Sequence, residues 1–457
     1  MENKYYFILL IFIISLFRHI NCRDKNKKKE LYVSFAIQIL SLGFGLKLLS
    51  FSDSYHVDMI GSFGDSIRIE LVTFVSLYLI LIGFDKFDRI KLENSFLFVL
   101  ILLVIVISFL NPLNILKPAI WSPISYYFQV WFLFHLIKSN FKIIEIFNGI
   151  YDAFFILTIF QLTLSICYPI LGMTSIGTLF VDTLDFSLRR AGIVSAMGTY
   201  GHPSSLAMIC LTYAIFFIIC YWNKYKKKLS LYLFMANLFI VYLTYSRTTY
   251  LISFFIFIIA FNLHKHQLFK VKNIVSVGIA SLFLITIVSL TPFGDMFFKS
   301  DSDSQVTNRV THWFLGYELW KKSELIGLGI NSHVLYMQNK LASTKLGQFA
   351  DLQFYLSNPI HNIHIIILVE TGLIGLYTWL YFFFFKLKQS FKQSYSKFKP
   401  FRIINITVFS LLLLVFTYGF MGWGIFLKET SSMFLLLIYF SSLTDRCLNK
   451  YSRVGLI

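Results

Sequence analysis

Residues 203–228 read PSSLAMICLTYAIFFIICYWNKYKKK, an uncharged run that ends in a cluster of lysines. A membrane-spanning helix needs about 20 consecutive, mostly apolar residues. The cluster Lys224–Lys228 is typical of the basic residues that flank spans on the cytoplasmic side. A second apolar run, Leu229–Tyr245, follows directly. This stretch therefore predicts two helices that cross a membrane and are joined on the cytoplasmic side.

The same alternation of apolar runs and short basic clusters continues along the whole chain. Of its 457 residues, 57% are hydrophobic and only 14% are charged, whereas soluble domains carry about 25% charged residues. The mean hydropathy is +0.69. We therefore predict an all-α fold, a polytopic transmembrane helix bundle of about 12–13 spans, in one integral membrane domain over residues 1–457. The candidate spans are Tyr5–Asn21, Leu31–Ser50, Ser66–Phe84, Ser95–Leu110, Ala119–Ile137, Ile144–Leu171, Pro203–Trp222, Leu229–Tyr245, Thr248–Leu263, Asn273–Thr291, His361–Phe385, Ile403–Met421 and Ile425–Leu443.

The basic clusters predict the orientation of these spans. The net charge of +18 is concentrated between apolar runs, which favours membrane topology and anionic lipid over nucleic acid as its cause. The run Tyr5–Ile20 precedes a basic cluster and no small-residue cleavage site, so we predict an anchor rather than a signal peptide. The N-terminus is then external and the C-terminus cytoplasmic. The cytoplasmic clusters are Arg23–Lys29, Lys86–Lys91, Lys138–Lys142, Lys224–Lys228, Lys265–Lys272 and Lys386–Arg402.

The opposite, external side carries long connections, above all the loop at residues 292–360. Long loops without spans are usually functional or disordered, and this one holds too many Trp, Tyr, Leu and Ile residues for disorder. One set of residues recurs at helical spacing and predicts an amphipathic helix that lies on the membrane or covers the bundle. The set is Val306, Val310, Trp313, Tyr317 and Trp320.

Four polar stretches on the external side stand out from the apolar background. They are Arg189–Gly192 with Gly198–Ser205, Thr244–Thr249, Asn308–Arg309 with Gly327–Ser332, and Asn358–Asn362 ahead of the span that contains Glu370–Gly375. Their order along the chain is more specific than any one of them. Together they resemble the O-antigen ligase and O-antigen polymerase superfamily over roughly the last two-thirds of the chain.

This resemblance implies a glycosyltransferase of the bacterial inner membrane with its active site on the periplasmic side. Its members transfer a glycan from undecaprenyl pyrophosphate to a hydroxyl of another lipid-linked repeat unit or of lipid A-core. Family arginines are thought to bind the pyrophosphate, and a histidine beside the long loop is thought to act in catalysis. The matching residues here are Arg190 or Arg189, Arg247, Arg309 and His361, with His202, Asn362 and Glu370 as possible supporting residues. Ser204 stands where the family more often has asparagine, and we assign it no role.

The chemistry of these residue types agrees with the resemblance. Arginine stays charged and binds phosphate with two hydrogen bonds. Such a site accelerates the reaction by stabilising the negative charge that develops on the leaving pyrophosphate. We predict that Asn358 caps the helix of the span His361–Phe385, that Pro359 occupies its first position and that His361 lies in its first turn. The positive helix end then favours a neutral imidazole, which can accept a proton from a sugar hydroxyl.

The remaining polar residues of the spans have structural interpretations. Glu370 can pair with an arginine, brace the bundle or accept a proton, and we favour the brace. Gly372 and Gly375 favour close helix packing over ligand contact. Asp152 is predicted to be a buried polar anchor, and His364 to be buried and structural.

Several functions fit these features. We favour the polymerase, with no cofactor and no metal, because the arginines replace the charge of a metal. The partners are then the lipid-linked donor, the glycan acceptor, membrane lipids and, as the resemblance implies, a chain-length regulator protein. The alternatives are a ligase acting on lipid A-core, a flippase, and a transferase that uses metal bound by loop acids. Those acids are Asp53, Asp58 and Asp65.

Overall fold

The computed structural model describes most of the long apolar runs as helices. It describes residues 13–15, 17–41, 47–50, 68–87, 95–114, 121–172, 189–190, 193–200, 202–265, 302–342, 359–420, 422 and 435–439. The helices are α2 (Lys25–Ser41), α3 (Leu71–Leu81), α4 (Ser95–Leu110), α5 (Trp121–Asn140), α6 (Ile143–Cys167), α8 (Pro203–Trp222), α9 (Lys227–Leu243), α10 (Arg247–His264), α13 (Ser302–Trp320), α14 (His333–Ala342), α16 (Ile363–Gln393) and α17 (Lys399–Gly419). The predicted all-α helix bundle is confirmed.

Four of the described helices are long and apolar enough to cross a membrane. They are α6, α8, α16 and α17, and shorter apolar helices accompany them. Most of α8 and α17 is buried inside the bundle, whereas α4 exposes apolar side chains such as Val99 and Leu110. The chain is therefore a membrane protein in which α8 and α17 are central and α4 presents an apolar surface suited to lipid.

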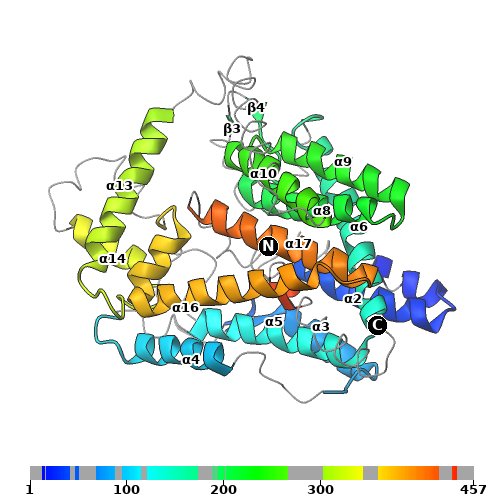
Figure 1. Ribbon diagram of the computed structural model, residues 1–457, viewed down its shortest axis with the longest axis horizontal. Coiled ribbons are helices and arrows are strands. Elements are labelled where there is room, and N and C mark those ends of the chain that lie inside the picture. The colour runs from blue at the N-terminus through cyan, green and yellow to red at the C-terminus, as the bar shows by residue number, and fades with distance from the viewer. Residues whose placement is uncertain are drawn as a thin grey trace.

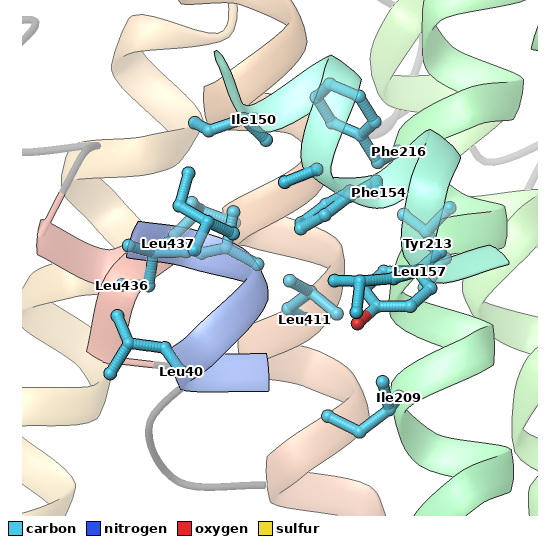
Figure 2. Packing of buried hydrophobic residues seen from close by; sticks show 14 of the residues in the cluster. Leu40, Ile150, Phe154, Leu157, Ile209, Tyr213, Phe216, Leu411, Leu436 and Leu437 are labelled. Atoms are coloured by element: carbon cyan, nitrogen blue, oxygen red, sulfur yellow. The ribbon is translucent and has the colours of Figure 1, made fainter. Parts of the chain in front are cut away.

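Aromatic and aliphatic side chains from distant parts of the chain fill the core. Helix α2 packs on α6, α8 on α9, and α17 on α8, α10 and α16. Phe154 of α6 lies 4.5 Å from the ring of Tyr213, measured between centroids, and 5.1 Å from Phe216. Figure 2 shows these rings in one apolar cluster with Leu411 of α17 and Leu40 of α2. Such packing joins the first, middle and last thirds of the chain into one bundle.

Asp152 of α6 ties the segment before α2 to the bundle as a polar anchor, although its side chain is 26% exposed rather than buried as predicted. Its carboxylate accepts two hydrogen bonds from the Arg18 guanidinium, at 2.9 and 2.7 Å, and one from the Ser34 hydroxyl at 2.7 Å. A bidentate arginine–carboxylate pair is the strong form of such contacts. It satisfies a charge that an apolar bundle otherwise leaves without a partner.

The structure contains two pairs of short antiparallel strands among the described residues, and the first pair lies where spans were predicted. Strands β1 (Lys47–Ser50) and β2 (Arg68–Glu70) pair with each other, as do β3 (Arg189–Arg190) and β4 (Ile193–Val194). The span predicted over Leu31–Ser50 therefore ends as a helix at Ser41, and the next helix begins at Leu71. Short runs of this kind do not distinguish strand from helix by periodicity, so hydropathy alone misplaced the boundaries.

The long loop contains two of the described helices. Helices α13 and α14 lie together at one end of the bundle, beyond the end of α16 where that helix begins (Figure 1). The predicted spans at Asn273–Thr291 and Ile425–Leu443 lie outside the described residues, apart from a helical segment at residues 435–439. The described part of the fold thus places α13, α14 and His361 together at the start of α16.

Candidate functional site

His361 lies directly before the cap of α16. The cap is Asn362, whose side-chain oxygen accepts hydrogen bonds from the backbone N–H groups of His364 and Ile365 at 2.9 and 3.1 Å. The prediction that His361 lies in the first helical turn is therefore wrong, because α16 begins at Ile363, four residues after Pro359. An extended asparagine satisfies two orphan N–H groups at once. His361 remains next to the positive end of the helix.

Helix α13 packs on this start of α16. The predicted amphipathic helix is confirmed over Ser302–Trp320, but its packed face differs from the predicted one. Val310 and Tyr317 are exposed, whereas Leu319 is buried and Trp313 and Trp320 are half-buried. Sequence reasoning missed His312, a buried residue whose ring lies 5.6 Å from that of His361 between centroids. Its spacing of three residues after Arg309 is the signal that places both on one side of α13.

Helix α16 is broken at Gly372, and a segment of the long loop occupies the break. Gly372 has φ 65° and ψ −165°, a conformation that interrupts the helical hydrogen bonds. The carbonyls of Val369 and Glu370 accept from the N–H groups of Leu328 and Gly329, each at 2.8 Å. On the far side of the break, the Leu373 N–H donates to the Glu324 carbonyl at 2.9 Å. Residues 324–329 thus supply the backbone partners that the broken helix lacks.

Three glycines make this close approach possible. A Cβ on Gly372 would lie 2.2 Å from the Leu325 carbonyl oxygen, and one on Gly327 would lie 2.4 Å from the Glu370 backbone. A Cβ on Gly329 would lie 2.4 Å from Cγ of Asn114. The close packing predicted for Gly372 is therefore present, and its partner is a loop rather than a helix.

We call the break in α16 together with residues 324–332 the seat. The end of α4 contacts it from the other side. The Asn111 side chain donates to the Gly327 carbonyl at 2.8 Å, and the Ile330 N–H donates to the Ser108 hydroxyl at 2.7 Å. The Tyr336 hydroxyl donates to the Leu113 carbonyl at 2.5 Å. Burial raises the pKa of Tyr336, which keeps this donor protonated. The seat is consequently held from two helices that are distant in sequence.

Glu370 pairs with His333, the first residue of α14. The Glu370 carboxylate Oε1 lies 2.6 Å from Nδ1 of His333, and the two side chains are 11% and 5% exposed. This contact agrees with the brace that we favoured for Glu370. Sequence reasoning missed His333, for which the only signal is that it follows the glycine-rich stretch 327–332. The pair joins the outer part of α16 to α14.

We expect Glu370→Ala to lower the free energy of unfolding by about 3 kcal/mol, because removing one partner of a buried pair leaves the other without compensation. Glu370→Gln keeps an acceptor and should lose less. Thermal unfolding of the detergent-solubilised protein measures both. Glu318→Ala is the matched control, since Glu318 is 53% exposed and pairs with Lys321 on the surface of α13, where such pairs contribute little. Equal shifts for Glu370→Ala and Glu318→Ala would contradict the bracing role.

A second group of candidates lies where α9 and α10 meet. The Ala196 N–H donates to the Leu243 carbonyl at the end of α9, at 2.9 Å. The Gln161 side chain donates to the Thr199 hydroxyl at 2.9 Å and accepts from the Thr199 N–H at 3.3 Å. Tyr245 takes φ 50° in the turn between the helices, and a non-glycine residue in that region stores strain of a kind common at functional sites. The segment after β4 is thereby fixed beside the turn.

The predicted arginines are divided between the two groups. Arg189 and Arg190 form β3, Arg247 is the first residue of α10, and Arg309 lies within α13. The side chains of these four arginines lie outside the described part of the structure. His202, the competing base, caps α8 by accepting from the Ser204 N–H through Nδ1 at 3.2 Å. Helix α17 packs between α10 and α16 and so connects the two groups.

The candidate residues form no recognisable metal centre. Among the described residues, no group of three or more His, Cys, Asp or Glu side chains is placed to hold a metal ion. Asp53, Asp58 and Asp65, the acids of the metal-dependent alternative, lie outside the described residues. The described candidate residues offer histidines and an amide, and histidine is suited to proton transfer.

Comparison with known proteins assigns part of the chain to a family. Residues 231–380 match the family model described as O-antigen ligase. The matched segment runs from α9 through α10, α13 and α14 into α16, so it includes Arg247, Arg309, His361 and the seat. No curated protein matches the chain significantly.

Proposed function

We propose, because residues 231–380 match the family model described as O-antigen ligase, that the chain is a membrane glycosyltransferase of the O-antigen ligase and polymerase superfamily that polymerises lipid-linked oligosaccharides. In this proposal the repeat units are carried on undecaprenyl pyrophosphate and are joined at the periplasmic face of the inner membrane. The product is an O-antigen or a capsular polysaccharide. The acceptor is another lipid-linked repeat unit, and a chain-length regulator is a proposed partner.

The observation that carries this proposal is the meeting of α13 and the start of α16. His361 lies in the position before the Asn362 cap, and α13, which bears Arg309, packs against the same few residues. A histidine beside an arginine-bearing helix combines a base with a binder of phosphate. Their position at one end of a bundle of apolar helices suits a donor whose lipid tail stays in the membrane.

The chemistry proceeds in one displacement. His361 accepts the proton of the acceptor hydroxyl, and the hydroxyl oxygen forms a bond to the anomeric carbon of the donor glycan. The bond from that carbon to the phosphate oxygen breaks, and its electron pair leaves with undecaprenyl pyrophosphate. Arg190, Arg247 and Arg309 stabilise the charge that grows on the leaving group. Asn362 and Glu370 hold the start of α16 and so support the base.

We expect Arg247→Ala to leave only single-repeat glycan in a deletion strain that wild type restores to full-length glycan. Removing a donor that binds transition-state charge costs about 100- to 1,000-fold in rate. A gel of surface glycan measures the result, and Lys399→Ala, an exposed residue at the start of α17, is the matched control. Full-length glycan from Arg247→Ala at normal protein levels would remove Arg247 from the site.

The same gel separates the proposed polymerase from its relatives. Core bearing one repeat in the uncomplemented deletion strain supports polymerisation, whereas core bearing no repeat supports a ligase that acts on lipid A-core. Loss of a flippase also leaves core with no repeat on this gel, and a separate assay for lipid-linked units held on the cytoplasmic side distinguishes it from loss of a ligase. The three outcomes differ because polymerisation, ligation and flipping leave different intermediates.

We expect transfer by the purified protein to continue in excess EDTA, because fixed arginine charge takes the place of a divalent cation at the pyrophosphate. The assay follows the conversion of lipid-linked repeat units to longer glycans with and without chelator. Loss of transfer in EDTA, restored by added Mg²⁺ or Mn²⁺, would contradict the arginine-only mechanism and return attention to Asp53, Asp58 and Asp65.

A further inference from the structure

Helix α13 packs closely on the start of α16 at Gly316, which contributes no side chain to the contact. A Cβ on Gly316 would lie 2.5 Å from Cγ2 of Ile365 and 3.1 Å from Cδ1 of Ile360. The residues one turn away from Gly316 on the same face of α13 are therefore pressed against the segment that contains His361. Figure 1 shows α13 at this end of the bundle.

His312 is the residue one turn before Gly316 on this face. Its side chain is 1% exposed, and its ring centroid lies 5.6 Å from that of His361 with an angle of 33° between the ring planes. The two rings are thus in contact at a shallow tilt. His361 is half-buried, so one part of its ring packs against His312 while another part stays accessible to a ligand.

An imidazole is an unfavourable side chain to bury at position 312 if its role is only to fill space. The other buried positions on the same face are Gly316 and Leu319, which carry no polar side-chain atom. A buried polar ring costs free energy unless it is hydrogen-bonded, a requirement that leucine would not bring. A simple filler would also need no aromatic partner, whereas the ring of His312 is placed against the one side chain here that has a proposed chemical role.

We infer that His312 is a positioning residue for His361, holding the plane of that ring and covering one of its faces from water. The inference rests on the proposed function, in which His361 accepts the proton of the acceptor hydroxyl. Arg309 lies three residues before His312 on α13, so one helix sets both the ring of the base and the position of a phosphate-binding residue. A base held in one orientation loses less of its rate to misalignment.

The test uses the full-length protein in membranes with lipid-linked repeat units as substrate. We expect His312→Ala to lower kcat by about 10- to 100-fold with KM changed less than about twofold, and His312→Phe to restore most of the loss because a flat ring still supports His361. The matched control is His364→Phe, which changes a histidine in the first turn of α16 that contacts Phe416 of α17 and Phe420 directly after that helix. This variant should keep wild-type turnover.

A second readout does not depend on transfer activity. Diethyl pyrocarbonate modifies accessible imidazoles, and mass spectrometry follows its reaction with His361. We expect His312→Ala to speed this modification several-fold and His364→Phe to leave it unchanged. Wild-type turnover and unchanged modification in His312→Ala, or a His312→Phe variant as slow as His312→Ala, would overturn the inference while the proposed function stands. A wild-type protein without transfer activity would overturn the proposed function, and faster modification in His312→Ala would then still establish the contact.

Discussion

Replacing His361 by alanine is expected to lower the turnover of glycan transfer by about 100- to 10,000-fold, the usual contribution of a general base. The protein should still insert and fold, because α16 is capped by Asn362 and not by His361. Without the imidazole, water must take the proton of the acceptor hydroxyl. The donor should bind as before, since the arginines that hold its pyrophosphate are unchanged.

The measurement is the rate of chain extension by membranes that contain equal amounts of each variant. His202→Ala is the informative comparison, because His202 is the competing base and sits at the cap of α8. A large loss in His202→Ala together with full activity in His361→Ala would reverse the assignment. Loss of the His361→Ala protein itself from the membrane would point to a structural role for the ring.

Replacing Gly372 by alanine is expected to expel residues 324–329 from the break in α16 and to abolish transfer. The new methyl group would lie 2.2 Å from the Leu325 carbonyl oxygen and 2.5 Å from the Ile326 nitrogen, both of them backbone atoms that cannot rotate away. Moving the segment breaks the hydrogen bonds from Leu328, Gly329 and Leu373. Each buried backbone group left without a partner costs about 1–3 kcal/mol, so we expect the total to exceed the stability of this part of the protein.

Gly172 offers a matched control for this substitution. It has φ 67°, close to the 65° of Gly372, yet a Cβ there would meet nothing within 4 Å. Gly172→Ala therefore carries the conformational strain alone, about 1–2 kcal/mol, and should leave protein that still transfers glycan. Protease sensitivity of the long loop, compared between the two variants, measures whether the segment has left its seat. Similar cleavage in both would show that the contact at Leu325 is not decisive.

The helices were the most predictable part of the fold. The predicted span Pro203–Trp222 coincides with α8, because proline at its start and lysines after its end mark both limits in the sequence. The break in α16 gave no such signal. The residues on both sides of Gly372 are mostly apolar, so hydropathy continues across it, and the backbone partners come from a loop more than 40 residues earlier in the chain.

The site was predictable to the extent that single residues signal their chemistry. Glu370 was selected because charged residues are rare within spans, and His361 through the family resemblance. Glu370 lies at the break in α16, and His361 lies against α13. The cap was misplaced because Asn358 and Asn362 offer the same side chain, and only the backbone decides which one faces the free N–H groups. His312 and His333 escaped notice since their importance depends on which residues they meet in space.

The break in α16 also determines which part of the protein carries the base. Residues 324–329 bond to carbonyls before the break and to N–H groups after it, and Glu370 binds His333 on the same side as His361. The first nine residues of α16 are therefore bonded to the long loop as well as to the rest of their own helix. Any glycan that displaces this loop on binding shifts His361 with it, so that occupancy of the loop and alignment of the base become one event.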